Sequence, residues 1–377
     1  MINSKTLLAL LLCGMVEVSA KPPIKHPIKH TKSVKEIPSL KKVFKKDFVI
    51  GTALNIYQID DKDPQATSLI AQQFNTATPE NIMKAQIIHP KWDVYNFEPA
   101  DKLIAYCKNL NLEVNAHALI WHSQLPNFVR QIKDADSVKT FFENHITTVA
   151  KRYDGKVKTW DVVNEALNED GTMRRSIFLN KLGENFVTEA FRLAQLASPK
   201  SELYYNDYNN EQPAKRAGCI ALIKKIQAAG VKIDGVGIQG HWHLGKIPLK
   251  QIEESILQYA ALGVKVAFTE LDIEVLKRDF QGADVNQRMQ NSPSLNPYAN
   301  GLPDSLQNQL AMDYEALFNL FLKHKDKISR VTFWGVHDGQ SWLNGWPVRG
   351  RTNYPLLFDR NYQPKPAFYS VISTKGK

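Results

Sequence analysis

Short apolar runs alternate with longer stretches of helical period from Asp47 to the end of the chain. Eight of these runs are rich in β-branched and aromatic residues and have the length of buried strands. They are residues 48–51, 74–77, 112–116, 157–163, 203–205, 236–238, 264–269 and 331–334. Because apolar residues on both faces are typical of parallel strands covered by helices, the pattern predicts a buried parallel sheet.

The stretches of helical period lie between these runs and after the last one. They are residues 64–73, 99–109, 137–151, 180–197, 213–229, 248–262, 306–323 and 365–372. Several begin with Pro, which is favoured in a first helical turn, and Gly230 and Gly263 follow two of them, where helices commonly end. Eight such units predict an α/β fold, a closed (β/α)8 TIM barrel with a single catalytic domain over residues 44–374. An open doubly wound sheet is the alternative, although this chain lacks the Gly-rich first loop of that fold.

The first 20 residues do not fit the barrel pattern. They contain Lys5, an apolar run over residues 7–12 and small residues at their end, which is the pattern of a secretory signal peptide. A surface lipoprotein with Cys13 as its lipidated residue is the alternative, and the large Leu12 disfavours it. We therefore expect a secreted protein, extracellular or periplasmic.

Residues 21–43 are rich in Lys, Pro and His and predict a basic, flexible tail. In such a segment His26 and His30 are expected to be solvated rather than to hold a metal. The tail also explains the formal net charge of +10, because residues 21–46 contain nine Lys and one Glu and residues 47–377 carry only +2. A nearly neutral folded part is not a phosphate-binding surface, so we expect no nucleic acid partner.

The remaining composition narrows the class of protein further. No second stretch of about 18 apolar residues follows the signal peptide, so we expect no membrane span. Cys107 and Cys219 lie far apart in two predicted helices and lack metal-ligand spacing, which predicts buried free thiols. We expect a monomer that needs no metal and no cofactor.

Polar side chains collect where the predicted strands end, and in a TIM barrel these ends form the rim that carries the active site. Glu165 and Glu270 each end an apolar run there. A single carboxylate at a rim is more often structural than catalytic. A pair without metal-ligand spacing predicts cleavage of a glycosidic bond, which needs one protonated and one charged carboxyl group.

The neighbours of the two carboxylates suggest their roles. Asp272 and His241 are placed to bond to each other and to Glu270, which would keep Glu270 ionised as a nucleophile. Glu165 would then hold its proton through like-charge repulsion and act as the acid. Aromatic rings that can stack on sugars occur at the same rim; they are Trp121, Trp334, Trp342, Trp346, Tyr208 and Tyr354.

Seven motifs at successive strand ends carry a resemblance to a known family. They are Thr-Pro-Glu-Asn-x-Met-Lys, His-x-x-x-Trp-His-Ser-Gln, Trp-Asp-Val-Val-Asn-Glu, Tyr-Asn-Asp-Tyr-Asn, Gly-Ile-Gln-Gly-His, Thr-Glu-Leu-Asp and Trp-Gly-Val-x-Asp-x-x-Ser-Trp. This set resembles glycoside hydrolase family 10, whose members are mostly retaining endo-β-1,4-xylanases on a (β/α)8 barrel. The resemblance covers residues 44–370, and the departures Ala85, Ala118 and Ile120 lie beside functional positions rather than at them.

The resemblance implies a role for each matching residue. Glu165 would be the acid/base and Glu270 the nucleophile of an endo-β-1,4-xylanase acting on xylan and xylo-oligosaccharides. Asn164 would hold the sugar 2-hydroxyl, His241 and Asp272 would orient Glu270, and Asp161, His117 and Gln239 would support them. The non-reducing side of the cleft would be lined by Glu80, Asn81, Lys84, Trp121, Gln124, Trp334 and Trp342, with Asn206 and Tyr208 further along the site.

Two other functions remain open from the residues. An endo-β-1,4-glucanase needs only a cleft wall that admits one more hydroxymethyl group, and a catalytically silent carbohydrate-binding protein needs only the cleft. The chain also contains a long segment, residues 275–304, after the predicted nucleophile strand. Loops of this length are usually functional. We predict that this one overhangs the aglycone side and affects which decorated xylans fit.

Overall fold

The predicted closed barrel is confirmed. The computed structural model describes residues 37–280 and 282–376, and the predicted signal peptide and residues 21–36 of the predicted tail lie outside them. Eight parallel strands form the barrel: β1 (Val49–Leu54), β2 (Thr76–Pro79), β3 (Glu113–Trp121), β4 (Thr159–Asn164), β5 (Glu202–Asp207), β6 (Gly235–Ile238), β8 (Lys265–Glu274) and β9 (Ile328–Phe333). A short strand, β7 (His241–His243), pairs with the end of β8.

Two pairings close the ring, which runs from β1 through β6 to β8, β9 and back to β1. β1 pairs with β9, and β6 pairs with β8. This closure excludes the open doubly wound sheet. The strands are buried along most of their length, and all six residues of β4 are buried, as their apolar sequence requires.

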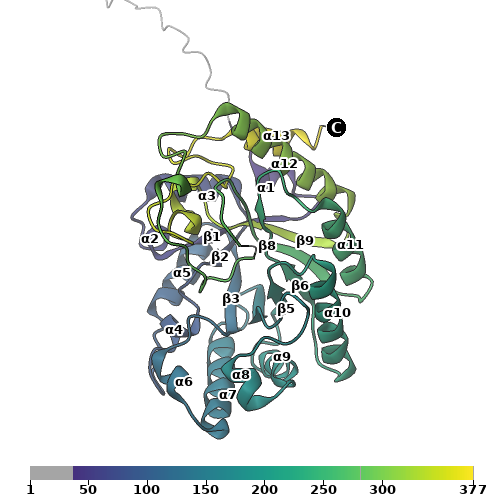
Figure 1. Ribbon diagram of the computed structural model, residues 1–377. Coiled ribbons are helices and arrows are strands. Elements are labelled where there is room, and N and C mark those ends of the chain that lie inside the picture. The colour runs from purple at the N-terminus through teal and green to yellow at the C-terminus, as the bar shows by residue number, and fades with distance from the viewer. Residues whose placement is uncertain (1–36, 281, 377) are drawn as a thin grey trace, which may run out of the picture. The chain divides into compact units, whose positions relative to one another are not determined.

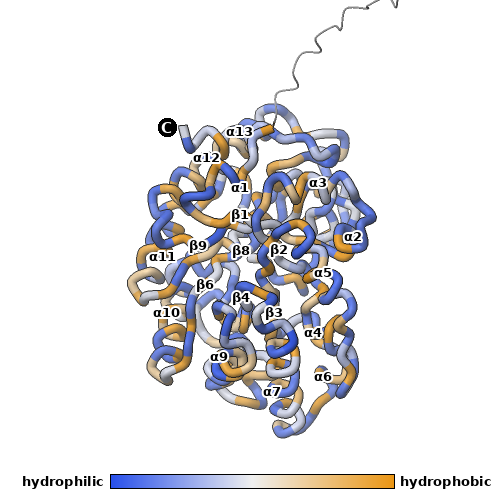
Figure 2. Tube along the Cα trace, turned by 180° about the vertical axis from the view of Figure 1, so that it is seen from behind, coloured by the Kyte–Doolittle hydropathy of each residue, from blue (hydrophilic) through white to orange (hydrophobic). Residues whose placement is uncertain are grey.

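Helices surround the barrel (Figure 1). The longer ones are α3 (Pro64–Gln73), α5 (Glu98–Asn109), α7 (Ala135–Arg152), α9 (Phe186–Ala197), α10 (Pro213–Ala228), α11 (Leu249–Ala260), α12 (Asp304–Lys323) and α13 (Pro366–Ser373). The shorter ones are α1 (Leu40–Val43), α2 (Ile56–Ile59), α4 (Ala85–Ile88), α6 (Asn127–Gln131) and α8 (Ile177–Leu182). Hydrophobic residues recur between hydrophilic ones along the outer helices (Figure 2), as expected for helices with one buried face.

The predicted helix over residues 180–197 is wrong as a single element. It consists of the end of α8 and the whole of α9. Gly183 separates them with a φ of 76°, a left-handed conformation that glycine adopts without steric cost and that ends a helix. The second strand also begins two residues later than predicted, at Thr76.

The start of the described chain packs against the barrel. Leu40, which we placed in the flexible tail, is buried in α1, and its backbone N–H donates to Gln73 Oε1 at 2.9 Å. Asp47, just before β1, has a fully buried carboxylate that pairs with Lys325 at 3.0 Å and with Lys375 at 2.7 Å. Both ends of the described chain are therefore fastened at the amino-terminal face of the barrel.

Two further features of the described residues bear on the predictions. Cys107 and Cys219 are buried free thiols, as predicted. No helix in this part of the chain combines the length and the apolar character needed to cross a bilayer.

Candidate active site

Irregular pairing at the carboxyl end of β4 shapes the rim. The β3–β4 ladder shifts register between His117 and Ile120, and the β4–β5 ladder shifts between Asp161 and Val163. Strict alternation would place Asp161 and Asn164 on opposite faces of β4. The irregularity lets both bond to residues of other barrel strands: Asp161 Oδ2 lies 2.9 Å from His117 Nδ1, and Asn164 Oδ1 accepts from Asn206 at 2.9 Å.

Glu270 lies near the middle of β8 and is held by a chain of polar groups. Its Oε2 is 3.2 Å from His241 Nε2, and the other ring nitrogen is 2.9 Å from Asp272 Oδ1. Trp342 Nε1 donates to Asp272 Oδ2 at 2.8 Å, and Asn206 Nδ2 donates to Glu270 Oε1 at 2.8 Å. Both oxygens of Glu270 are thereby fixed.

The charges of the side chains around Glu270 keep its carboxyl group ionised. Burial disfavours the charged ring of His241, but the carboxylates of Asp272 and Glu270 outweigh it and raise the pKa of His241 to about 10. Burial alone would raise the pKa of Glu270; the hydrogen bond from His241 and nearby positive charges outweigh it and lower that pKa below its usual value. A charged imidazolium therefore lies against an ionised carboxylate near neutral pH.

Glu165 directly follows β4 and meets different partners. Trp121 Nε1 donates to its Oε2 at 2.8 Å, and Gln239 Nε2 and Asn164 Nδ2 each donate to its Oε1 at 3.1 Å. The backbone of Glu165 has a φ of 58°, which is uncommon for a residue with a side chain and often found at functional sites. Glu165 is thus oriented by neutral donors on both oxygens.

These residues border one cleft at the carboxyl ends of the strands. It has a volume of about 300 Å³ and contains both carboxylates. Thirteen residues predicted from the sequence line it: Glu80, Asn81, Lys84, His117, Trp121, Gln124, Asn164, Glu165, Gln239, His241, Glu270, Trp334 and Trp342. Trp346, predicted as a rim aromatic, also lines it.

Lys84 places its amino group in this cleft. Its Nζ donates to Asn81 Oδ1 at 3.2 Å and lies 4.5 Å from the centre of the Trp121 ring. Burial lowers the pKa of Lys84 below its usual value, and the nearby carboxylates of Glu270, Glu80 and Glu165 offset only part of this effect. The cleft therefore presents both an amino group and carboxyl groups to one ligand.

Four predicted site residues do not line the cleft. Asp161 and Asp272 lie behind His117 and His241, and Asn206 is fully buried beneath the two carboxylates. Tyr208 is 4% exposed because Lys215 Nζ lies 3.8 Å from its ring centre and Arg174 donates to its hydroxyl.

One of the six aromatic residues predicted to stack on sugars also lies elsewhere. Tyr354 does not border the cleft, and its hydroxyl donates to the Tyr298 carbonyl oxygen at 2.6 Å. It fastens the long segment after β8 to the loop after β9. The sequence placed Tyr354 in a rim loop, as observed, but the loop position alone could not tell which way the side chain turns.

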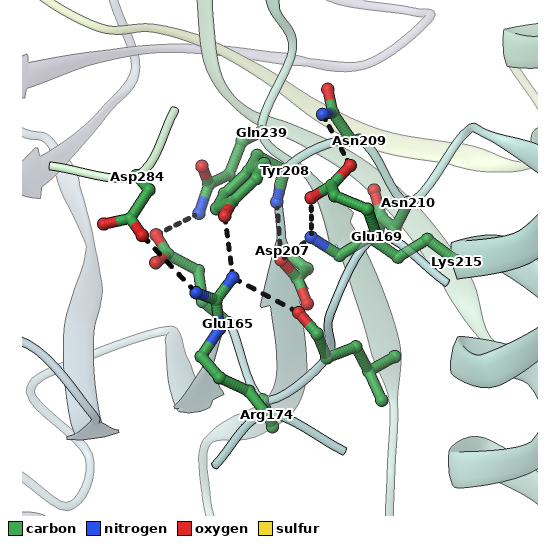
Figure 3. Close-up of polar contacts among 12 residues, drawn as sticks. Glu165, Glu169, Arg174, Asp207, Tyr208, Asn209, Asn210, Lys215, Gln239 and Asp284 are labelled. Carbon is green, nitrogen blue, oxygen red and sulfur yellow. Dashed lines mark hydrogen bonds and ion pairs between the residues drawn. The ribbon is translucent and has the colours of Figure 1, made fainter. Parts of the chain in front are cut away.

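A second network, beside Glu165, was missed in the sequence (Figure 3). Arg174 donates to Tyr208 Oη at 2.7 Å and lies 3.6 Å from Asp284. Lys215 Nζ, which is fully buried, lies 2.9 Å from Asp207 and 3.1 Å from Glu169. Lys215 shares the buried stripe of α10 with Cys219, Leu222 and Ile226, and a lysine on an apolar stripe is the one signal that marked this network.

Part of the long segment after β8 also reaches the cleft. Ala283, Val285 and Arg288 line it together with Gly345, and none of the four was predicted. We call residues 282–288 the strap. Asp284 lies 3.6 Å from Arg174, and Gly282 lies close to the Tyr208 ring. The overhang on the aglycone side and its effect on decorated xylans stay predictions.

Another cavity, of about 340 Å³, lies at the opposite, amino-terminal end of the barrel. Its charged residues are largely satisfied by one another. Lys265 and Lys158 pair with Glu202 at 2.8 and 3.6 Å, and Arg330 donates to Asn115 at 3.0 Å. The charged side chains at this end therefore pair with one another and stabilise the barrel, whereas Glu165 and Glu270 line an open cleft.

Comparison with known proteins agrees with this geometry. The model of glycosyl hydrolase family 10 matches residues 39–374. The chain is 44% identical to "Endo-1,4-beta-xylanase A" of Xylanibacter ruminicola, over 89% of this chain and 93% of that protein. It is 41% identical to "Beta-1,4-xylanase" of Dictyoglomus thermophilum, over 89% of this chain and 91% of that protein.

A solved structure gives the same result. It is described as a novel GH10 endoxylanase retrieved from a sugarcane soil metagenome. It is similar with a TM-score of 0.85 at 40% identity, and the match covers 89% of this chain and 99% of that one. This chain is therefore a member of glycosyl hydrolase family 10.

Proposed function

We propose that this chain is an endo-β-1,4-xylanase that hydrolyses internal bonds of xylan by double displacement with retention of configuration. The observation that carries the proposal is the pair of unlike carboxylates in one cleft. Glu270 is held against a charged His241, and Glu165 is held by neutral donors only. The similar proteins named as xylanases support xylan as the substrate.

In the first step, an oxygen of Glu270 attacks the anomeric carbon while Glu165 gives its proton to the leaving glycosidic oxygen. A covalent glycosyl ester of Glu270 forms, and the bond to the leaving sugar breaks. His241 keeps Glu270 ionised before the attack, and Asn206, bonded to both Glu270 and Asn164, fixes its angle.

In the second step, Glu165 accepts a proton from water, which attacks the same carbon and releases Glu270. Glu165 thus ends the cycle protonated, ready for the next bond. Two inversions give net retention, a route that suits carboxyl groups about 5 to 5.5 Å apart. Lys84, Trp121, Trp334 and Trp342 are assigned to holding the sugar on the non-reducing side.

The proposal is tested by following the products. Reducing-sugar release from xylan is expected to exceed that from carboxymethylcellulose, and NMR is expected to show the β-anomer as the first product. Faster cleavage of carboxymethylcellulose would identify a glucanase instead. An α-anomer formed first would show an inverting mechanism and remove the nucleophile role of Glu270.

We also propose that the protein is exported and acts as a monomer. The signal-peptide pattern of Met1–Ala20 supports export. Amino-terminal sequencing of protein recovered outside the cytoplasm is expected to begin at Lys21. A mature protein that begins at a lipidated Cys13 would replace this assignment, and light scattering would reveal an oligomer.

A further inference from the structure

The strap begins and ends on one wall of the barrel mouth and reaches the opposite wall. In the ring of eight strands, β8 is the seventh and β3 the third, so they stand opposite each other. The chain leaves the barrel at the end of β8 and returns in α12, before β9. Its contacts, however, are with the loops that follow β3, β4 and β5.

Three contacts fasten the strap to that far wall. Asp284 Oδ2 lies 3.6 Å from Arg174 Nη1, after β4 (Figure 3). Ser123 Oγ, after β3, donates to Asn286 Oδ1 at 3.4 Å. Gly282 lies so near Tyr208, after β5, that a Cβ built on it would be 3.2 Å from the ring. The strap is therefore held by side-chain contacts at the ends of β3 and β4 and packs closely at the end of β5.

The near wall holds both ends of the strap. Arg278, four residues before it, pairs with Glu274 at 2.8 Å, and its guanidinium lies 4.6 Å from the centre of the Trp346 ring. After the strap, Met289 N–H donates to the Pro347 carbonyl oxygen at 3.4 Å. Between these attachments, Ala283, Val285 and Arg288 line the cleft that contains Glu165 and Glu270.

The geometry points to a strap that crosses the mouth of the cleft and selects substrates by chain length. This inference rests on the proposed xylanase function. A short xylo-oligosaccharide can enter beneath the strap by its end. An internal bond of a long or branched chain reaches the carboxylates only when the contacts to Arg174 and Ser123 open. Asp284 and Asn286 are thus specificity-determining residues.

The contacts that hold the strap closed are weak enough for it to open and close reversibly. The side chains of Arg174 and Asp284 are 14% and 25% exposed, so water weakens their attraction. An ion pair of this kind changes an opening equilibrium by up to about fivefold. Opening is therefore expected to be frequent, and loss of the pair is expected to be measurable without loss of the fold.

The test compares two substrates with one enzyme. The ratio of kcat/KM on polymeric glucuronoxylan to kcat/KM on xylohexaose is measured for the full chain and for the variant Asp284→Ala with Asn286→Ala. We expect the ratio to rise about fivefold in the variant, mainly through the polymer, because the weak ties no longer hold the strap closed. The single variant Asp284→Glu keeps both the charge and Asn286, and it is expected to show the low ratio of the unmodified enzyme.

A matched control lies in the same loop. Asp279 is exposed and has no ion-pair partner among the described residues, so Asp279→Ala removes the same charge and is expected to leave the ratio unchanged. An equal ratio in the double variant and the unmodified enzyme, with both substrates cleaved, overturns the strap. An unmodified enzyme that cleaves neither substrate overturns the xylanase function, and the inference with it.

Discussion

At the scale of single residues, the two carboxylates differ in the charge of their partners. Glu270 faces the His241 ring, whose pKa is raised to about 10, whereas Glu165 accepts from an indole and two amides. A positive charge on the His241 ring favours the ionised form of the carboxylate beside it. Glu165, the proposed acid/base, has no such charged hydrogen-bond partner among the described residues.

Replacing Glu270 by Ala is expected to reduce kcat on xylan by about 10⁴-fold or more, because it removes the proposed nucleophile and leaves only binding. Affinity for xylohexaose, measured by calorimetry, is expected to persist. Glu98→Ala is the matched control, since the Glu98 side chain is 73% exposed. Turnover near that of the unmodified enzyme would contradict the assignment of Glu270.

Sequence patterns located these residues well where chemistry and strand position coincide. Glu165 directly follows β4, Glu270 follows an apolar run, and the residue types alone suggested the bonds that join His241 to Asp272 and to Glu270. The buried position of Tyr208 was not predictable, because it depends on Arg174, which lies in a loop without periodicity. Contacts between two loops leave no regular spacing in the sequence.

At the scale of elements, β6 shows why a glycine can serve the active site without touching the substrate. Gly237 lies in this strand beside β5, and a Cβ built on it would be 2.2 Å from Asn206 Oδ1. Asn206 is the residue that bonds both Asn164 and Glu270. Because Gly237 has no side chain, β6 leaves room for the side-chain amide of Asn206 on β5.

Gly237→Ala is expected to lower kcat by about 10²-fold, because the added methyl displaces Asn206 and with it the angle of Glu270. The circular dichroism spectrum is expected to remain that of a folded barrel. Kinetics on an aryl xylobioside measures the effect. Full activity in a folded variant would show that Asn206 has no positioning role.

The root of the strap contains a buried group of charges. Glu274, at the end of β8, pairs with Arg278 at 2.8 Å and with Arg351 at 3.0 Å, and all three side chains are at most 2% exposed. This group joins the strand to the loop after β9. An uncompensated charge there has no access to water, so removal of one partner is costly.

Arg351→Ala is expected to lower the free energy of unfolding by about 3 to 5 kcal/mol, because Glu274 loses one of its two cations. Denaturant unfolding measures the change. Arg349→Ala, at an exposed position two residues earlier, is the control and is expected to have little effect. A loss below about 1 kcal/mol would mean that the loop relaxes and lets water reach Glu274.

At the scale of the whole molecule, the barrel followed from periodicity, and the loops did not. Each of the eight apolar runs overlaps one of the strands β1–β6, β8 and β9, because burial on both faces leaves a continuous apolar sequence. The short helices α2, α4 and α6 contain only four or five residues, too few to show a helical period. The strap was recognisable only by the length of its loop.

Buried histidines are expected to make the fold sensitive to acid. Burial lowers the pKa of His145 to about 3 and the pKa values of His89, His122 and His243 to about 4. The unfolded chain binds protons on these rings from about pH 6.5 downward, whereas the folded chain does not until about pH 4. The free energy of unfolding is therefore expected to fall as the pH falls through this window.

The free energy of unfolding falls between pH 7 and pH 5, and His145→Phe is expected to make this fall smaller by about 2 kcal/mol. The variant has no imidazole ring to protonate at this position. Phenylalanine preserves the stacking of this ring on Phe141 and His89. Denaturant unfolding at the two pH values measures the difference. An unchanged difference would show that His145 is already protonated in the folded protein at pH 5.

The pairing of Asp47 with Lys325 and Lys375 has a consequence for how the enzyme meets a solid material. It fixes Lys375, near the carboxyl end of the described residues, on the face of the barrel opposite the cleft. A resin or fibre joined through that end would hold the molecule by its back, with the cleft turned outward. Immobilised in this orientation, the enzyme is expected to retain access to insoluble plant fibre, whereas attachment through lysines near the cleft would block it.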